Sequence, residues 1–448
     1  MKAEEIYLKL YRQYADVVAH HSAPLLNQPR EAALAALEEN GIPDNAQEEY
    51  RHFDLHQALE VDYGMNLNRF ITKLNPQDVF CCDVPNLSTR LLFVVNDQCS
   101  KIPLKAVLPE GVLCGSLQDF AVSHASLLEP YYGQLSKDST DGMVALNTLF
   151  AQDGFVLYLP AGVQIDKPIQ LIQVLHGKED RMVNRRLLII AEEGSHAQLL
   201  VCDHALSSKK FFSNQVAEIF VGKNASLEYY ELEMDHDDTV RVSNTLIKQD
   251  SNSKLLLNGI TLQNGKTRNN LYVKLSGEYA ETNLSGMALA DQDHVVDNHL
   301  FVDHVSPHCT SRELYKYVLD HQARGVFGGR ILVRKNAQKT EAYQSNKNLC
   351  STREARMFTK PQLEIYADDV KCSHGTATGQ IDEKALFYMR TRGISEVEAR
   401  LLLKFAFTAD VIDNIRLEPL KDRMKMLVEK RFRGELARCA GCTAAGKS

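Results

Sequence analysis

The strongest constraint on the fold is a pattern that runs from about residue 154 to residue 380. Short segments rich in Val, Ile, Leu and Tyr recur there between Gly, Asn, Asp and Lys, as in residues 155–159, 186–190 and 254–258. No helical pattern of about 10–15 residues separates these segments, which disfavours alternating βαβ units. This part of the chain is therefore predicted to consist of strands joined by tight corners.

A weak internal repeat marks the corners. Residues 160–163, 193–197, 223–226 and 335–338 each place Gly or Asn directly after an apolar run. Gly and Asn tolerate the left-handed backbone conformation that a sharp corner needs. Such repetition is typical of a β-solenoid, in which each coil buries its inward side chains against the next. Because the period is irregular, a large β-sandwich remains the alternative.

Helical sequence flanks the repeat on both sides. Residues 29–37 are rich in Ala and Leu, and Gly41 and Pro43 then favour the end of a helix. Further on, Asp382 can cap a helix that Gly393 ends. We therefore expect four parts: a largely helical N-terminal region (1–145), a mainly β core (146–380), a C-terminal helical domain (381–436) and a flexible tail (437–448).

A second C-terminal helix is predicted after Ser395, which can form a capping box with Glu398. Apolar side chains follow one face of this helix: Val397, Leu401 and Phe405, with Leu402, Ala406 and Ala409 beside them. Such a stripe packs either on the protein's own core, which is the commoner case, or on a partner.

The composition argues against several classes of protein. The 51 basic and 58 acidic residues give a formal charge of −7, which disfavours a broad nucleic-acid interface. The absence of Trp disfavours a sugar-binding cleft. The N-terminus does not resemble a signal peptide, and apolar runs such as residues 187–191 are too short to span a bilayer. Ten cysteines without a secretory leader predict reduced thiols in a cytoplasmic protein that is not bound to a membrane.

Two motifs near the C-terminus match known patterns but lack the structural context or the ligands that these patterns need. Residues 441–448 match the phosphate-binding P-loop pattern, but a P-loop needs a strand before it and a helix after it. Cys439 and Cys442 form a single CxxC, which supplies two of the four ligands that a structural metal site needs. The adjacent Cys81 and Cys82 do not complete it, so an intrinsic, fully ligated iron–sulfur cluster is not expected.

Potential metal ligands crowd residues 291–309: His294, His299, His304, His308 and Cys309. If the segment is a strand, His294, His304 and His308 could share one face. Residues ten apart lie roughly 33 Å apart on a straight strand, so corners would have to bring them together. A polar solenoid surface is the favoured interpretation, and a metal site is the alternative.

Cys372 and His374 form a more specific pair. In an extended segment they point to the same side, about 7 Å apart. A thiolate and an imidazole there could bind a soft or borderline metal or shuttle a proton, with further ligands from another chain. The alternative is a small buried Cys beside a hydrogen-bonded surface His. No nucleophile elbow, HExxH pair or dinucleotide fingerprint accompanies them.

A series of ordered signatures runs through the later part of the chain: residues 311–316, 325–329, 337–340, 344–349 and 361–365. Residues 145–147 and 158–163 and the acidic-then-aromatic residues 48–51 precede them. In this order they resemble the SufB/SufD family, which belongs to the Suf machinery for iron–sulfur cluster assembly. The resemblance is close after residue 145 and loose before it.

One segment distinguishes the two branches of that family. Residues 368–375, 387–388 and 392–394 resemble the SufD branch, whereas SufB-like proteins carry a Glu-His-Glu-Ala type segment in this place. The chain departs from the family pattern at Tyr50, where Trp is usual, at residues 349–351 and in the CxxC tail.

The resemblance implies a right-handed parallel β-helix between helical terminal domains, in agreement with the β-solenoid predicted from the residues. It also implies a non-catalytic subunit of the SufBCD complex, which pairs with SufB and binds the SufC ATPase through its C-terminal helices. The candidate ATPase contacts are Arg392, Gly393, Ile394, Leu401 and Phe405.

The resemblance further implies that His374 faces SufB where a nascent cluster forms, and supplies a metal-binding imidazole or a proton relay. Cys372 is the weaker candidate, because a small buried thiol packs well by default. No cofactor is expected to be bound intrinsically, although a transient iron–sulfur cluster could be shared with SufB. Expressed alone, the chain is expected to form a homodimer. The alternatives are a β-helix enzyme acting on polysaccharide and a homodimeric iron store or donor.

Overall fold

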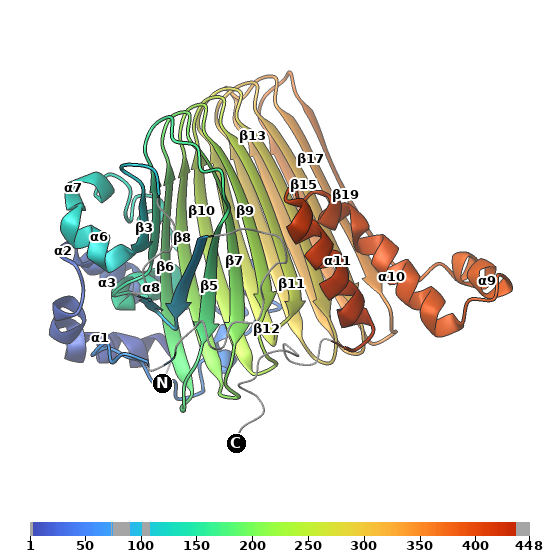
Figure 1. Cartoon of the computed structure of the whole chain (residues 1–448), viewed down its shortest axis with the longest axis horizontal. Helices are drawn as coiled ribbons and strands as arrows, with labels where there is room; N and C mark the ends of the chain where they lie inside the picture. The colour runs from blue at the N-terminus through green and yellow to red at the C-terminus, as the bar shows by residue number, and fades with distance from the viewer. Residues whose placement is uncertain (1–2, 73, 75–89, 101–107, 436–448) are drawn as a thin grey trace.

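The computed structural model describes residues 3–72, 74, 90–100 and 108–435. Its centre is a long stack of strands, with the N-terminal helices at one end and the C-terminal helices beside the other (Figure 1). The predicted β-solenoid between helical regions is therefore confirmed, and the β-sandwich alternative is wrong. Among these residues, no helix is long and apolar enough to cross a membrane.

The strands of the coil alternate between two sheets. One sheet contains β5 (Ile169–Leu175), β7 (His196–Ala205), β9 (Ser226–Met234), β11 (Lys254–Gln263), β13 (Glu281–Ala290), β15 (Thr310–Leu319), β17 (Glu341–Cys350) and β19 (Lys371–Gly379). The other contains β4 (Phe155–Leu159), β6 (Arg181–Ala191), β8 (Phe211–Val221), β10 (Thr239–Gln249), β12 (Lys266–Leu275), β14 (Val295–His304), β16 (Arg324–Val333) and β18 (Arg356–Ile365).

Three N-terminal strands complete these sheets. The first becomes ten-stranded with β1 (Arg90–Val95) and β2 (Gln98–Cys99), and the second nine-stranded with β3 (Leu113–Ser116). Neighbouring strands of the coil pair in parallel, whereas β2 and β3 pair antiparallel to their neighbours. About 30 residues separate partners in successive coils, so side chains far apart in sequence stack in columns.

Three of the four predicted corners have the left-handed backbone conformation that the sequence predicts, whereas in the fourth, residues 335–338, none of the residues has a positive φ and the left-handed residue is the following Lys339. Gly162, Gly194 and Asn224 lie in three of the predicted corners and have φ angles of 74°, 68° and 57°. Most residues with a Cβ adopt this left-handed conformation only at a cost, which Gly avoids and Asn tolerates. At these three corners the local sequence marks the end of the strand, whereas other corners place Tyr279, Gln292 or His308 in the same conformation.

The first part of the chain contributes mainly helices: α1 (Ala3–His20), α2 (Pro24–Asn27), α3 (Arg30–Asn40), the 3₁₀ helix η1 (Glu48–Tyr50), α4 (Leu55–Ala58), α6 (Leu117–Ser123), α7 (Ala125–Leu128) and α8 (Gly142–Phe150). The helix predicted in residues 29–37 is α3, and it ends as predicted. Gly41 has a φ of 66°, and its N–H donates to the Leu37 carbonyl at 3.0 Å.

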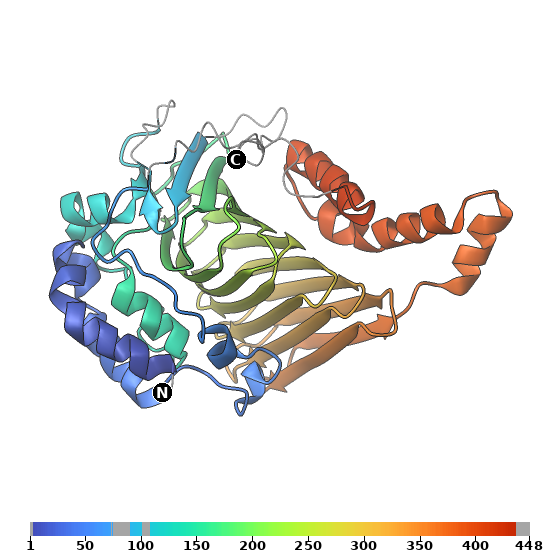
Figure 2. The same cartoon turned by 90° about the horizontal axis from the view of Figure 1, so that it is seen from below.

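The C-terminal helices are α9 (Glu383–Thr391), α10 (Glu396–Asp413) and α11 (Glu418–Phe432). Asp382 and Ser395 cap α9 and α10 as predicted. The end of α10 and all of α11 lie along the outer face of the ten-stranded sheet, whereas α9 projects away from it (Figure 2). An ion pair of 2.6 Å between Lys316 and Asp410 joins α10 to β15.

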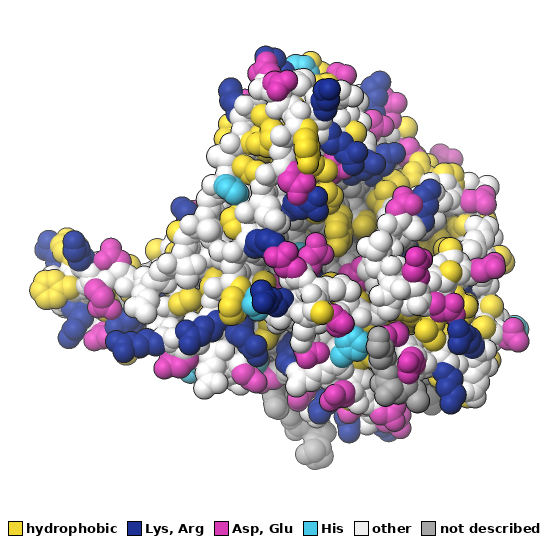
Figure 3. All heavy atoms as spheres, turned by 180° about the vertical axis from the view of Figure 1, so that it is seen from behind, with side chains coloured by type: hydrophobic (Ala, Val, Ile, Leu, Met, Phe, Trp, Pro, Cys, Tyr) yellow, Lys and Arg dark blue, Asp and Glu magenta, His cyan; other side chains and the backbone are white. Residues whose placement is uncertain are grey.

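The N-terminal region covers part of the outer face of the nine-stranded sheet. The Tyr50 hydroxyl donates to Asp141 at 2.5 Å, and the Arg268 guanidinium lies 3.6 Å from the centre of the Tyr50 ring. Beside this contact is a cavity of about 330 Å³, lined in part by Tyr272 and Phe301. Hydrophobic side chains gather in a hollow when the molecule is seen from behind (Figure 3).

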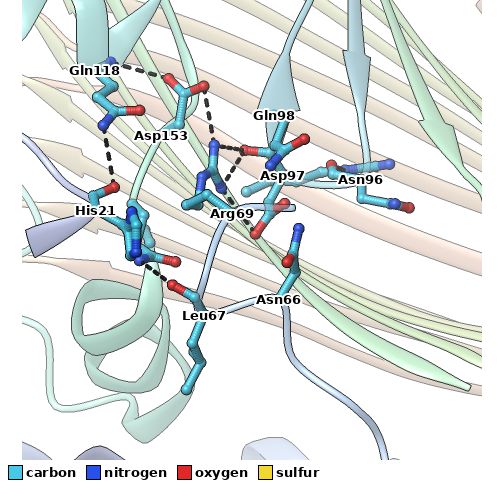
Figure 4. Close-up of polar contacts among 12 residues, drawn as sticks. His21, Asn66, Leu67, Arg69, Asn96, Asp97, Gln98, Gln118 and Asp153 are labelled. Atoms are coloured by element: carbon cyan, nitrogen blue, oxygen red, sulfur yellow. Dashed lines mark hydrogen bonds and ion pairs between the residues drawn. The ribbon is translucent and has the colours of Figure 1, made fainter. Parts of the chain in front are cut away.

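A buried carboxylate, Asp153, ties several N-terminal segments together where the coil begins (Figure 4). It accepts hydrogen bonds from the Ser116 hydroxyl at 2.8 Å and from the Gln118 N–H at 3.0 Å. It also accepts from the Cys99 N–H at 3.1 Å and pairs with Arg69 at 3.2 Å. Four donors on one carboxylate satisfy its oxygens inside the protein, as a buried charge requires.

Candidate functional site

The β-helix ends at two edge strands, β18 and β19, to which no further strand is paired in the described chain. Their side chains are mostly exposed or half-buried, unlike those of the preceding coils. An edge strand presents unpaired N–H and C=O groups that can pair with a strand of another molecule. We call this end, formed by β18 and β19, the open end.

Cys372 and His374 both lie on the lumen side of β19. Cys372 is in register with Ala342 and His374 with Gln344, and both of these β17 side chains are buried inside the coil. The two candidate ligands therefore share one face of the strand, as predicted. Burial raises the pKa of the Cys372 thiol, which disfavours the thiolate, whereas His374 is exposed.

His374 ends a column of inward side chains that passes through successive coils. In register, the column contains Ile169, Leu199, Tyr229, Leu257, Leu284, Glu313, Gln344 and His374. Its side chains are apolar or aromatic from Ile169 to Leu284, and the last three are polar. The column therefore becomes polar only in the coils nearest the open end.

Gln344 lies between Glu313 and His374 in the polar part of this column. Its Nε2 donates to Glu313 Oε2 at 2.6 Å, and both side chains are only 3% exposed. Its Oε1 has no hydrogen-bond partner within the described part of the chain. Gly329 on the facing sheet makes room for the amide, because a Cβ there would lie 2.4 Å from Gln344 Nε2. An unused amide oxygen is thus buried one coil below His374.

Glu313 is the buried acid of this column. Burial raises its pKa to about 8, and the hydrogen bond from Gln344 offsets only part of that effect. Glu313 is therefore mainly protonated and neutral at pH 7. A neutral carboxyl group lies two coils below His374.

Large apolar side chains are exposed on the last strands around the open end: Tyr343, Phe358, Ile365 and Tyr366. The Phe358 ring stacks on His52 with 4.0 Å between ring centres. Apolar side chains grouped beside a free strand edge are typical of a protein–protein contact surface.

The four histidines of residues 291–309 lie apart and have different partners: His294 is beside Asp291, His299 beside Asp297, His304 bonded to Ser311 and His308 stacked on Tyr279. The expectation of a polar surface is wrong for His294 and His304, which are buried. Burial lowers the pKa of His304 to about 4, so this imidazole is neutral at pH 7. The reason is the stacking of coils, which encloses side chains that a single strand would leave exposed.

No group of three or more His, Cys, Asp or Glu side chains suited to a metal ion occurs among the residues that the structure describes. Cys372 and His374 offer two donors. A tetrahedral site needs four ligands, so a metal or cluster held here would need donors from a second chain.

The five predicted ATPase contacts lie on α10 and on the turn between α9 and α10, but they differ in exposure. Arg392 and Gly393 form an exposed turn, in which Gly393 has a φ of 85°. Leu401 is only 8% exposed, and Phe405 packs against the cluster that joins α10 to the sheet. Ile394 is half-buried. Leu401 and Phe405 therefore stabilise the protein's own fold.

Other apolar side chains of α9 and α10 face solvent: Phe387, Tyr388, Val397 and Leu402. Phe387 is 69% and Val397 79% exposed. Hydrophobic side chains are visible at the tip of the projecting helix (Figure 3). We call these four residues the arm patch. In the stripe predicted on α10, Leu401 and Phe405 thus pack on the protein itself, whereas Val397 and Leu402 face solvent.

Some predictions fall outside the described residues. These are the CxxC pair Cys439 and Cys442, the P-loop-like residues 441–448, and Cys81 and Cys82. The flexible tail over 437–448 stays a prediction for the same reason.

Reasoning from the sequence did not single out Glu313, Gln344 or Phe387 as site residues, and it named Val397 only as part of the apolar stripe on α10. Glu313 and Gln344 lie in the signatures at residues 311–316 and 344–349, but Glu313 directly follows Arg312, and no local pattern marks it as buried. Their alignment with His374 depends on a coil of about 30 residues, which the irregular repeat did not show. The exposure of Phe387 and Val397 depends on how α10 docks.

Comparisons with known proteins agree with this architecture. Residues 174–407 match the family described as "SUF system FeS cluster assembly, SufBD core domain", and residues 1–171 match the "SufBD protein N-terminal region". An iron–sulfur cluster assembly SufBD family protein of Synechocystis is 29% identical over 95% of each chain.

Two further relatives carry a more specific name. The iron–sulfur cluster assembly protein SufD of Escherichia coli is 31% identical over 64% of this chain and 69% of its own length. The protein of the same name in Bacillus subtilis is 26% identical over 78% of this chain and 81% of its own length. The chain therefore belongs to the SufB/SufD family of iron–sulfur cluster assembly proteins.

Proposed function

We propose that this chain is a SufD-type, non-catalytic subunit of a Suf complex that assembles iron–sulfur clusters. It pairs with a SufB-type paralogue through the open end and binds a SufC-type ATPase through the arm patch and the turn at Arg392. The observation that carries the proposal is His374, an exposed imidazole on the lumen side of the last strand. The relatives named SufD support the choice of branch.

Pairing at the open end follows from its incomplete structure. β18 and β19 each have one free edge in the described chain, and the side chains around them include exposed Tyr366 and Phe358. A paralogue with the same β-helix could extend both sheets and cover these side chains. When no paralogue is present, a second copy of this chain could do the same, which accounts for the expected homodimer.

A nascent cluster is the cargo at this contact. His374 supplies an imidazole nitrogen, and Cys372 supplies a thiol that must lose its proton to bind iron. Because the two provide only part of a ligand set, the partner provides the rest. The cluster is therefore bound only in the assembled complex, and the chain holds no resident cofactor.

The first test replaces His374 by Ala in a complex co-expressed with the SufB- and SufC-type neighbours of its gene and purified on a tag carried by this chain. Iron and acid-labile sulfide per complex are measured after reconstitution. We expect the complex to form and its cluster content to fall several-fold, because one donor is lost. The control is His308→Ala, an exposed histidine of a corner outside the last two coils.

Two outcomes would contradict the proposal. If His374→Ala leaves cluster content equal to that of His308→Ala, the imidazole has no part in assembly. If no complex forms with the unmodified chain, the SufD-type role itself is wrong.

A second test concerns the ATPase contact. Val397→Asp puts a charge on a side chain that is 79% exposed, so the fold is expected to be kept. Desolvating an unpaired carboxylate at an interface is costly, and we expect ATPase binding to weaken at least about tenfold, or about 1.4 kcal/mol. Binding is measured by isothermal titration of the ATPase into the full chain.

The matched control for that test is Val122→Asp, which makes the same change at an exposed valine of α6. Equal affinities of Val397→Asp and Val122→Asp would place the ATPase contact elsewhere.

A further inference from the structure

A pocket of about 690 Å³ lies outside the β-helix, between the ten-stranded sheet and the loop that joins α10 to α11. Strands β13, β15, β17 and β19 form its floor, and residues 413–416 form one wall. Its apolar lining includes Leu256 and Leu314. The pocket shares Tyr343 and the β19 residue Ser373 with the border of the open end, whereas the ATPase contact proposed above lies outside it.

Polar side chains cross the floor of the pocket in a row. Asn283, Arg312, Tyr343 and Ser373 occupy one register position on four neighbouring strands. With about 4.8 Å between strands, this row spans roughly 14 Å. In the part of the chain that the structure describes, Arg312 forms no ion pair and no side-chain hydrogen bond. The row therefore offers the free guanidinium of Arg312 to a ligand. It is also longer than a single small ion, so it can accommodate a larger molecule.

The uncompensated charge in this pocket is positive. Arg416 is 3.4 Å from Glu228, and Asp413 is 3.8 Å from Lys425, so each has a partner of opposite charge. Arg312 has none. A guanidinium presents a planar fork of donors that fits the oxygens of a phosphate group, and this favours an anionic ligand.

Tyr343 adds an aromatic surface directly beside Arg312. The two residues are in register on adjacent strands, and the Tyr343 side chain is partly exposed to the pocket. Rings stack on such a surface, whereas a lone phosphate gains nothing from it. The volume also lies in the range of about 300–1,000 Å³ that is usual for sites of small organic ligands.

We propose that this pocket binds a small phosphate-bearing molecule with a planar ring, of the size of a mononucleotide. Its phosphate pairs with Arg312 and its ring lies against Tyr343. Because the α10–α11 loop forms one wall, the ligand contacts both the β-helix and the C-terminal helices. The site goes beyond the proposed assembly role and does not depend on it.

The test titrates the purified full chain with AMP, inorganic phosphate, adenosine and citrate by isothermal calorimetry. We expect AMP to bind more tightly than either phosphate or adenosine, since only AMP carries both groups. Arg312→Gln is expected to weaken AMP binding at least about tenfold. Tyr343→Ala is expected to weaken AMP binding while leaving the weaker phosphate binding unchanged. Arg353→Gln, at an exposed arginine outside the pocket, is expected to have no effect.

Three results would overturn this proposal. The absence of saturable AMP binding would remove the site. An equal loss of AMP affinity in Arg312→Gln and Arg353→Gln would show that AMP is attracted by the general positive charge and not by a specific contact with Arg312. Tighter binding of citrate than of AMP would exclude a ring-bearing phosphate as the ligand class. Thermal unfolding of all three variants without ligand verifies that they are folded.

Discussion

Replacing Glu218 by Gln is expected to lower the free energy of unfolding by about 3–5 kcal/mol. The Glu218 carboxylate lies on the outer face of β8, beneath the N-terminal region, and pairs with Arg186 at 2.6 Å. Neither side chain is exposed to solvent. The substitution keeps the shape of Glu218 but leaves the Arg186 guanidinium buried without a countercharge.

Glu218 also holds the backbone of the segment that covers it. Its oxygens accept hydrogen bonds from the N–H groups of Gly133, Leu135 and Ser136 at 2.8–3.0 Å. A Gln amide can accept at only one of its two positions, so part of this set is lost as well. The carboxylate therefore stabilises both the ion pair and the docking of residues 133–136 on the β-helix.

The measurement is the urea unfolding midpoint at pH 7, followed by circular dichroism. The control is Glu193→Gln, which breaks a surface pair with Lys223 in which both side chains are more than half exposed. Exposed pairs contribute about 0–1 kcal/mol, so this variant should unfold close to the unmodified chain. Equal midpoints for the two variants would contradict the assigned role of Glu218.

Replacing Glu313 by Gln is expected to make the protein more stable than the unmodified chain at alkaline pH. Burial raises the pKa of Glu313 in the folded state from 4.5 to about 8. Between these values the unfolded chain releases a proton that the folded chain keeps. The stability that Glu313 contributes is therefore fully present below about pH 4.5 and is lost as the pH rises towards 8.

The size of this effect follows from the same linkage. The unmodified chain should lose up to about 1.4 kcal/mol relative to Glu313→Gln for each pH unit in this window. Above about pH 8 both states are ionised and the difference stops growing. Glutamine does not titrate, and its amide can still bond to Gln344, so the two proteins should be similar near pH 5.

Urea unfolding of both proteins at pH 5, 6.5, 8 and 9 measures this difference. Glu281→Gln, at an exposed side chain of neighbouring β13, is the matched control. Parallel stability curves for the unmodified chain and Glu313→Gln over the whole range would show that Glu313 is not a buried neutral acid.

The two substitutions concern different coils of the β-helix, one on its outer surface and one in its lumen. Glu218 lies on the outside and fastens the N-terminal region, whereas Glu313 lies in the lumen, two coils below His374. Loss of Glu218 should weaken the whole fold. Glu313→Gln changes the protonation of the column that ends at the candidate site, and the same variant can therefore also be assayed for cluster content.

Much of the architecture was predictable because its causes are local. Gly162, Gly194 and Asn224 adopt positive φ angles at predicted corners, and this depends on each residue alone. Asp382 and Ser395 cap helices through bonds to backbone groups two or three residues away. Short apolar segments between such signals were correctly interpreted as strands.

The candidate site was predictable only in part. Cys372 and His374 are two positions apart, which places them on one face of any strand. This arrangement could therefore be predicted from the sequence. The histidines of residues 291–309 were misjudged, because burial of His294 and His304 comes from the coils stacked on either side. No local sequence pattern predicts that neighbouring coils bury these side chains.

The sequence by itself determined the strands, the corners that use Gly or Asn, the helix caps and the placing of Cys372 and His374 on one face, since each depends on residues close together in the chain. Only the tertiary structure decided that Glu313 and Gln344 stack below His374, that Leu401 is buried while Val397 is exposed, and that Arg312 faces an open pocket. These relations join residues about 30 or more positions apart. They exist only once the coil has set the register and the helices have docked on its outer face.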